Sequence, residues 1–481
     1  MIEKRDFYID GQWVAPLSAR DHQVIDPSTE EPCAVISLGA EGDADRAVLA
    51  ARAAFPAWMA TDPAERIALV EKFLEIYARR QEEMAQAISM EMGAPIDLAR
   101  SAQWGSGYAH TKNFLRAAKD FQFVRPLGDH APNDRIVYEA VGVCALITPW
   151  NWPMNQITLK VIAALIAGCT MVLKPSEESP LNALLFAEMM DEAGIPAGVF
   201  NLVNGDGAGV GAALSGHPEV DMVSFTGSTR AGIAISQNAA KTLKKVHLEL
   251  GGKGANVIFD DADDKAVKRG VLHMMNNTGQ SCNAPSRMLV QRARYDAAVE
   301  EAAAVASAVT VGSAHDEGRH IGPVVNASQF EKIQGLIQKG IDEGARLVAG
   351  GTGRPEGFNR GFFVRPTVFA DANNQMTIAR EEIFGPVLTI MPFDTEEEAI
   401  AIANDTPYGL TNYVQTSDGA RANRMALALR SGMVEMNGQP RGAGAPFGGM
   451  KASGNGREGG VWGLEDFLEV KAVSGWDAQT A

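Results

Sequence analysis

The sequence has few cysteines and no long apolar segment. Only four cysteines occur in 481 residues, at positions 33, 144, 169 and 282, and no two of them form a C-x-x-C pair. The most apolar runs, 141–150 and 159–168, are shorter than the roughly 20 residues of a membrane-spanning helix. We therefore expect free thiols, as a reducing compartment would keep them, and no membrane span.

Several other signals are missing. The opening stretch MIEKRDFYIDGQWV has no apolar core of the kind found in a secretory signal. The 59 acidic and 43 basic residues leave a net charge of −16, which disfavours nucleic acid and anionic membranes as partners. The only histidine cluster, HDEGRH at 315–320, lacks a third ligand at a zinc-like spacing. We expect a cytoplasmic protein that binds small molecules and no metal.

Strand and helix signals alternate through the middle of the chain. Short apolar strands are predicted between helical segments at 143–148, 170–175, 199–204, 221–227 and 246–252. Such alternation, with nearly all-apolar strands, is typical of a parallel sheet covered on both faces. The fold class is therefore α/β, with a doubly wound sheet.

A second alternating block extends from 254 to about 437. Its expected helices lie near 263–278, 294–309 and 328–343, and its expected strands at 254–259, 362–369 and 387–393. This block predicts a second α/β domain.

The flanking segments have other patterns. Asp10-Gly11 predicts a hairpin, and residues 43–92 have apolar residues at helical spacing. The stretches 121–142 and 467–473 are both extended in character, and we expect them to pair in a small sheet.

The usual dinucleotide fingerprint is absent. Glycines at 205, 207, 209 and 211 do not have the G-x-G-x-x-G spacing and follow the third strand of the first block. Two other segments favour a nucleotide. FTGSTRAG (225–232) places Gly-Ser-Thr where a helix begins, and KPSEESP (174–180) ends a strand with a lysine and a carboxylate. Each alone is better explained as a helix cap or a solvated turn, but their joint position at strand ends favours a phosphate and ribose site.

Seven segments occur in the order and spacing typical of one enzyme family. They are ITPWNWP (147–153), KPSE (174–177), FTGS (225–228), LELGGK (248–253), GQSCNAPSR (279–287), EEIFGPV (381–387) and PFGGMKASGNGREGG (446–460). With them the sequence resembles the aldehyde dehydrogenase superfamily over essentially its whole length.

The resemblance implies three parts and an assembly. A Rossmann-like NAD-binding domain would comprise residues 1–122 and 142–251, and an α/β catalytic domain residues 252–452. A small β extension for oligomerisation would comprise residues 123–141 and 453–481. Members of the family usually form dimers or tetramers, so a homodimer or homotetramer is expected.

Only one cysteine has surroundings suited to chemistry. Cys144 and Cys169 lie in apolar runs, and Cys33 begins another, so these three are expected to be structural. Cys282 alone has small, polar neighbours on both sides. Aldehyde oxidation needs such a nucleophile, because a hydride leaves readily only from an sp³ carbon that bears an alkoxide. The resemblance also implies that Cys282 is the nucleophile.

The resemblance implies the other catalytic roles. Asn151 would stabilise the oxyanion together with the backbone N–H of Cys282, although an asparagine in W-N-W is also a common turn former. Glu249 would activate the water that hydrolyses the thioester, although a structural salt bridge is the simpler explanation of such a residue. Lys160 and Glu458 would relay protons from that base.

The implied reaction converts an aldehyde to a carboxylic acid through a thiohemiacetal and a thioester that water hydrolyses. Transfer of the acyl group to coenzyme A is an alternative, against which Glu249 argues. An inactive structural relative is another, against which the joint presence of Cys282, Asn151 and Glu249 argues.

The resemblance implies NAD as cofactor. Its binding residues would be Thr148, Pro149, Trp150, Lys174, Ser176, Glu177, Gly207, Gly211, Phe225, Gly227, Ser228, Gly251, Glu382 and Phe384. The carboxylate of Glu177 would accept from the free ribose 2′-hydroxyl and repel a 2′-phosphate, which favours NAD over NADP. Lys174 beside it weakens that preference.

The implied aldehyde channel has fewer bulky aromatic side chains than simple-aldehyde relatives usually have. Its residues would be Asn155, Leu159, Ser281, Asn283, Gln439, Arg441 and Phe447. We expect a roomier and more polar channel. Arg441 could pair with an acidic group of the substrate, although an arginine on a glycine-rich loop more often faces solvent or a neighbouring subunit.

Overall fold

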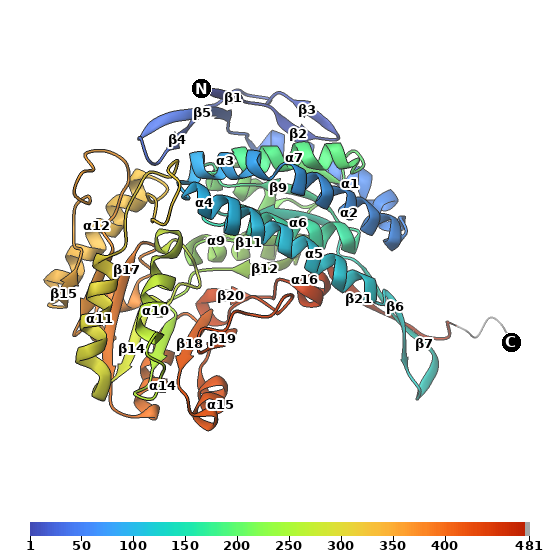
Figure 1. The fold of residues 1–481 in the computed structure, drawn as a ribbon. Helices are drawn as coiled ribbons and strands as arrows, with labels where there is room; N and C mark the ends of the chain where they lie inside the picture. The colour runs from blue at the N-terminus through green and yellow to red at the C-terminus, as the bar shows by residue number, and fades with distance from the viewer. Residues whose placement is uncertain (477–481) are drawn as a thin grey trace.

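In the computed structural model, which describes residues 1–476, the largest sheet takes all but one of its strands from the first half of the chain (Figure 1). Its five central strands are parallel, and they are the five predicted from the sequence. In spatial order the sheet contains β20 (Gly454–Asn455), β12 (Lys245–Glu249), β11 (Met222–Thr226), β8 (Val143–Ile147), β9 (Thr170–Lys174), β10 (Phe200–Leu202), β2 (Phe7–Ile9) and β3 (Gln12–Val14). The hairpin predicted at Asp10-Gly11 joins β2 to β3.

Helices cover both faces of this sheet, because the side chains of β8 alternate between two apolar cores. Val143, Ala145 and Ile147 join the core that includes α1 (Glu41–Ala60), α8 (Ala212–Gly216) and α9 (Thr229–Ala239). Cys144 and Leu146 join the other. That second core includes α2 (Pro63–Arg79), α3 (Gln81–Met92), α5 (Trp104–Asp120), α6 (Pro153–Ala167) and α7 (Leu181–Ala193). The doubly wound arrangement is therefore confirmed.

A second sheet of seven strands follows. Its spatial order is β15 (Arg346–Ala349), β16 (Thr367–Ala370), β17 (Val387–Phe393), β14 (Arg287–Gln291), β13 (Ala255–Ile258), β18 (Thr411–Gln415) and β19 (Met433–Met436). One face packs on α10 (Ala266–Met275) and α11 (Tyr295–Ser307). The other packs on α12 (Ala327–Asp342), α13 (Thr377–Arg380), α14 (Glu396–Asn404) and α15 (Gly419–Ala428).

One predicted strand of this sheet was too long. The strand expected at 362–369 begins only at Thr367. Pro366 precedes it and has no N–H to donate to a ladder, and the N–H of Phe362 donates to the carbonyl of Pro27 instead.

Two small sheets complete the structure. The predicted pairing of 121–142 with 467–473 is confirmed, because β7 (Ala131–Ala140) lies between β6 (Val124–Gly128) and β21 (Leu468–Val473). This sheet projects from the body of the molecule (Figure 1). At the N-terminus, β5 (Glu31–Ser37) pairs with β1 (Ile2–Lys4) and β4 (Asp21–Asp26).

The remaining elements are short. They are α4 (Ile96–Leu98), η1 (Ala99–Gln103), η2 (Gly207–Gly211), η3 (Ala240–Thr242), η4 (Asn276–Gly279), η5 (Arg292–Arg294), η6 (Lys451–Ser453) and α16 (Gly460–Asp466). Within residues 1–476, no helix combines the length and apolar character needed to cross a membrane. We retain the division into three domains as a proposal; its residues 477–481 lie outside the described part.

A buried arginine joins the second sheet to the segment that follows β12. Arg287, at the start of β14, has no exposed surface. Its guanidinium donates to the carbonyl oxygens of Lys253 (3.0 Å), Ile402 (2.9 Å) and Ala403 (2.8 Å), and to the side chain of Asn374 (2.9 Å). Burial lowers the pKa of Arg287 to about 10, so the group stays charged at neutral pH.

We expect Arg287→Met to lower the free energy of unfolding by about 3 kcal/mol, because it leaves several buried carbonyl oxygens without a donor. The exposed Arg424, which bonds Glu396 at 2.7 Å, provides the control. Arg424→Met should cost no more than about 0.5 kcal/mol. Denaturant titration of both variants measures this, and equal midpoints would contradict the expectation.

Candidate active site

The candidate site lies where the strand order of the first sheet reverses. The chain runs from β8 outward to β9 and β10, then returns to place β11 and β12 on the other side of β8. Ligands of doubly wound folds bind at the carboxyl ends of the strands beside such a reversal. Here the residues after β8 (149–151) and after β11 (227–228) line one cavity of about 160 Å³ together with Cys282.

Backbone packing brings Cys282 to this edge. The chain leaves α10 through a turn in which Gly279 has a φ of +70°, and a Cβ there would lie 2.1 Å from the carbonyl oxygen of Gly385. A turn closed by the Ala284 N–H and the Ser281 carbonyl oxygen (3.1 Å) then presents Cys282. A Cβ on Gly252 would lie 2.2 Å from the carbonyl oxygen of Cys282. The glycines after β12 therefore let the two segments touch.

Cys282 borders a second cavity as well, of about 420 Å³. Six of the predicted channel residues line it: Asn155, Leu159, Ser281, Asn283, Arg441 and Phe447. Asn155 and Leu159 are four residues apart on α6, which begins at Pro153, so both face the same way. The prediction for Gln439, the seventh residue, was wrong, because its side chain is exposed and does not line this cavity.

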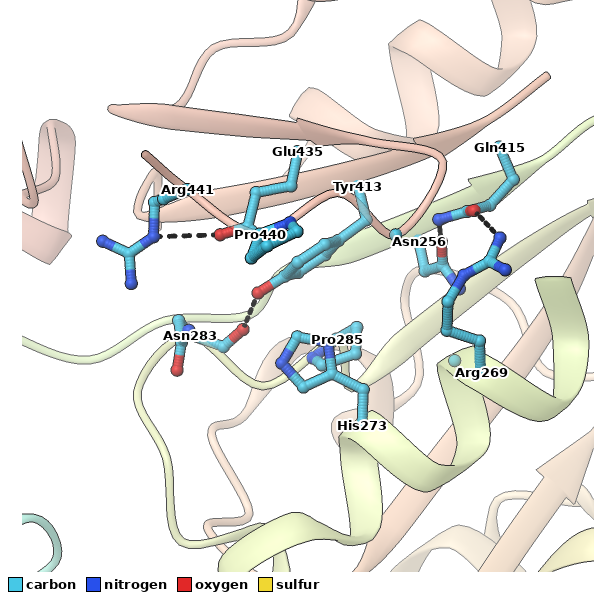
Figure 2. A pocket seen from close by; sticks show the side chains of 12 residues that line it. Asn256, Arg269, His273, Asn283, Pro285, Tyr413, Gln415, Glu435, Pro440 and Arg441 are labelled. Carbon is cyan, nitrogen blue, oxygen red and sulfur yellow. Dashed lines mark hydrogen bonds and ion pairs between the residues drawn. The ribbon is translucent and has the colours of Figure 1, made fainter. Parts of the chain in front are cut away.

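Arg441 stands between this channel and an adjoining cavity of about 460 Å³ (Figure 2). Its Nε donates to Glu435 at 3.0 Å, and its guanidinium lies 4.7 Å from the centre of the Phe447 ring. In the same view the Tyr413 hydroxyl donates to the carbonyl oxygen of Asn283 at 2.6 Å (Figure 2). Since Glu435 already balances Arg441, recognition of an acidic substrate by Arg441 stays a prediction.

Asn151 is fixed beside the cysteine segment. Its Nδ2 donates to the carbonyl oxygen of Gln280 at 3.0 Å. Its own carbonyl oxygen accepts from Gln103 (3.0 Å) and from Asn277 (2.9 Å). Asn151, the residue predicted for the oxyanion site, is thus buried and immobilised. Its partner Gln280 lies two residues before Cys282 in the sequence.

The surroundings of the Cys282 thiol favour its protonated form. Burial raises its pKa far above the usual range, and the carboxylates of Glu382 and Glu249 raise it further. The side chain is nevertheless half-buried rather than enclosed, because it borders both cavities. It therefore needs a proton acceptor or a positive charge nearby before it can act as a thiolate.

Glu249 is a buried acid with unused hydrogen-bonding capacity. Within the described residues, neither of its carboxylate oxygens has a hydrogen-bond partner. Burial raises the pKa of Glu249 to about 7, and Glu458 adds to the rise while His247 and Lys160 oppose it. The predicted relay pair lies next to it: Lys160 Nζ is 2.7 Å from Glu458 Oε1 and 3.0 Å from the Ser224 hydroxyl.

The sequence reasoning missed His247. Its Nε2 is 3.7 Å from Glu249 Oε1 and 4.0 Å from Glu458 Oε1, and its Nδ1 bonds Asp466. Burial alone would lower the pKa of His247, but its bond to Asp466 and the nearby carboxylate of Glu249 outweigh burial and raise the pKa to about 9. The sequence held a signal for His247, because residues two apart on a strand share a face and His247 is two residues before Glu249.

The predicted cofactor residues gather along one edge of the first sheet. Those that line the 160 Å³ cavity are Pro149, Trp150, Gly227, Ser228, Gly251, Glu382 and Phe384. The others belong to the ends of β8 to β11 or follow them: Thr148, Lys174, Ser176, Glu177, Gly207, Gly211 and Phe225. Lys174 and Glu177 form an ion pair at 3.1 Å. The Ser228 hydroxyl caps α9 by accepting from the N–H of Ala231 at 3.3 Å.

The same edge holds buried polar groups without partners. In the described part of the chain, the hydroxyls of Thr148 and Thr226 and both amide atoms of Asn204 have none. They follow or end β8, β11 and β10 respectively. Unpaired buried polar groups are costly, so their gathering at one strand edge indicates a polar ligand.

Comparisons with known proteins agree on one family. The model of the "Aldehyde dehydrogenase family" matches residues 13–473. A 3-succinoylsemialdehyde-pyridine dehydrogenase from a Pseudomonas species is 53% identical over 99% of this chain and 100% of its own length.

Solved structures share the fold. The aldehyde dehydrogenase of Bartonella henselae has a TM-score of 0.98 and 60% identity, covering 98% of this chain and 100% of its own. Aldehyde dehydrogenase C of Pseudomonas syringae was solved as a cysteine-to-alanine mutant in complex with NAD+ and octanal. It has a TM-score of 0.96 and 49% identity, covering 98% of this chain and 97% of its own.

Family model, relatives and structures each cover nearly the entire chain. The protein is therefore an oxidoreductase that acts on aldehydes, and it belongs to the aldehyde dehydrogenase family.

Proposed function

We propose that this protein oxidises an aldehyde to a carboxylic acid with NAD, through a thioester on Cys282 that water hydrolyses. The observation that carries the proposal is the position of Cys282, which lines two cavities. A nucleophile there can meet an aldehyde from one side while a nicotinamide lies on the other.

The first step is attack of the Cys282 sulfur on the aldehyde carbon. The developing negative charge falls on the aldehyde oxygen, which needs fixed donors. An amide nitrogen carries two hydrogens, and Asn151 uses one on the Gln280 carbonyl oxygen. The second is available for the oxyanion, together with the backbone N–H of Cys282. Because Asn151 is already immobilised, it does not have to reorganise during the reaction.

The nicotinamide end of NAD would occupy the 160 Å³ cavity, where it would supply the hydride acceptor. Glu382 and Phe384 line that cavity, and the Phe384 ring meets Trp150 edge-on at 5.5 Å. The partnerless hydroxyls of Thr148 and Thr226 offer contacts to a polar ligand. The solved structure of the aldehyde dehydrogenase of Bacillus cereus is an NAD+ complex, as is that of the P. syringae protein. The B. cereus structure is 38% identical, has a TM-score of 0.93, and covers 98% of this chain and 96% of its own.

Attack gives a thiohemiacetal, and loss of hydride from its carbon, with NAD as the acceptor when bound, would leave the thioester. The last step is hydrolysis of that thioester. Glu249 accepts a proton from water, which then attacks the acyl carbon and releases the acid and the Cys282 thiol. A carboxylate with a pKa of about 7 is well matched to this task near neutral pH. Lys160 and Glu458 lie next to it and connect it to the channel, which Glu458 lines.

We infer that the substrate has a polar group away from its aldehyde. Polar side chains of the channel include His110, Asn113, Asn155, Asn283 and Arg441. The Pseudomonas relative is named for a pyridine-bearing semialdehyde, which is consistent with such a channel. Assembly into a homodimer or homotetramer through the projecting small sheet, and a cytoplasmic location, stay predictions.

We expect Cys282→Ala to abolish NADH formation with every aldehyde, because no other described thiol borders either cavity. Absorbance of NADH should be followed with octanal, a pyridine-bearing semialdehyde and a carboxylate-bearing semialdehyde. The half-buried Cys33 provides the control, and Cys33→Ala should retain full activity. NADH formation by Cys282→Ala at the wild-type rate would overturn the cysteine mechanism.

We expect Glu249→Gln to retain a burst of about one NADH per active site and to lose later turnover by at least about 100-fold. In the wild type, the rate of thioester hydrolysis should decrease as the pH drops below about 7, because protonated Glu249 cannot accept a proton. Stopped-flow measurement of the burst and of acid release tests both. Release of an acyl-coenzyme A in place of the acid would instead favour the acylating alternative.

We expect the wild type to use NAD more efficiently than NADP, and Glu177→Ser to shift the ratio of kcat/KM toward NADP by about ten-fold. The substitution removes a carboxylate that would repel a 2′-phosphate and leaves Lys174 to attract it. Glu178→Ser is the control for charge alone. A wild-type KM lower for NADP than for NAD would show the assignment to be wrong.

A further inference from the structure

Glu249 and the four ionisable side chains around it come from four parts of the chain. His247 and Glu249 belong to β12, Lys160 to α6, Glu458 to the segment between β20 and α16, and Asp466 to the end of α16. His247, Glu249, Lys160 and Glu458 are each at most 3% exposed, and Asp466 is partly exposed. Buried charges of this kind are tolerated only when they compensate each other.

The charges in this cluster do not cancel without the histidine. Lys160 and Glu458 form one neutral pair at 2.7 Å. His247 and Asp466 form a second, through the histidine Nδ1. Glu249 remains as the third carboxylate, and the imidazole Nε2, 3.7 Å away, is the nearest positive group to it. With a neutral residue at 247, three carboxylates would remain with two ammonium groups, and one of these, Lys245, lies beside Asp466 rather than beside Glu249.

We propose that His247, held by Asp466, is a positioning residue that supplies the positive charge Glu249 needs to act as a base near neutral pH. The imidazole does not touch substrate or cofactor; it acts through Glu249. The inference rests on the proposed role of Glu249 and adds to it the group that tunes that role.

The packing leaves His247 little freedom. Gly456 has a φ of +83°, and a Cβ there would lie 2.6 Å from the histidine Nδ1. The backbone after β20 therefore lies directly against the ring. Asp466 fixes Nδ1, so Nε2 is directed toward the two glutamates.

No other described cation can take this place. Lys245 lies beyond Asp466, with its Nζ 3.7 Å from Asp466 Oδ1. Arg457 lies close to Glu249, but its guanidinium donates to the carbonyl oxygens of Gly449 (2.7 Å) and Gly456 (2.5 Å). Lys160 is already paired with Glu458.

The test is the pH dependence of thioester hydrolysis, measured in single turnovers from about pH 6 to about pH 10. For His247→Gln we expect the acidic limb of the pH–rate profile to move to higher pH by about one unit, because the neutral side chain no longer favours ionised Glu249. Hydrolysis near pH 6.5 should then fall by about ten-fold while the alkaline plateau stays within about two-fold of wild type. The NADH burst, which does not require the base for water, should remain.

Asp466→Asn provides a second variant if His247→Gln does not fold. Without the aspartate, buried His247 loses its proton more readily, so the limb should move in the same direction by a smaller amount. His315→Gln is the matched control, because the exposed His315 forms a similar pair with Asp26 at 2.7 Å and lines neither of the two cavities that Cys282 borders. Its limb should not move.

Two results would overturn the proposal. One is an acidic limb in His247→Gln, or in Asp466→Asn if only that variant folds, at the wild-type pH. The other is an equal loss of rate at every pH, which would indicate a purely structural role. Failure of the proposed function looks different: Glu249→Gln would then retain steady-state turnover, whatever the histidine variants do.

Discussion

The buried ion pair between Lys160 and Glu458 is the contact on which the site depends. Its partners are 298 residues apart in sequence and 2.7 Å apart in space, and both are almost completely excluded from water. An isolated charge in that position would cost several kcal/mol, so neither partner can be buried without the other. Folding of α6 against the first sheet is therefore coupled to the return of the C-terminal segment.

That return assembles the catalytic cluster from distant parts of the chain. β20 pairs with β12, the strand that carries His247 and Glu249. α16 packs on α5 and α6 and brings Asp466 to the histidine, and β21 continues into the small projecting sheet. A hydrophobic pair would join these segments at less cost than ions do. The retention of charge here is thus better explained by proton chemistry than by stability.

Much of this architecture could be predicted from the sequence because its signals are local. The Asp10-Gly11 hairpin, the helices of 43–92 and the five parallel strands each follow from the residues of one segment. The strand at 362–369 was misjudged because apolar content alone does not reveal that Phe362 bonds Pro27, far away in sequence. Cys282 was identifiable from its polar neighbours.

The roles of His247 and Asp466 could not be predicted, because they depend on contacts that are not local. Their importance depends on contacts over 219 residues, which no local pattern encodes. Alternation along β12 places His247 on the face of Glu249, but only the folded chain shows that this face is buried and that α16 closes it. Likewise, Gln439 was placed in the channel by resemblance to the family, whereas its side chain is exposed and does not line that cavity.

The site also links the two chemical steps through one negative charge. Glu249 and Glu382 both raise the pKa of Cys282, so the thiol resists ionisation while Glu249 is charged. When Glu249 is protonated, the thiolate forms beside a neutral acid and that repulsion is relieved. For thioester hydrolysis the charge must return to Glu249, and by then the sulfur is acylated and uncharged. A base whose pKa lies near 7 can hold the proton in one step and release it before the other, which a fully exposed carboxylate could not do at neutral pH.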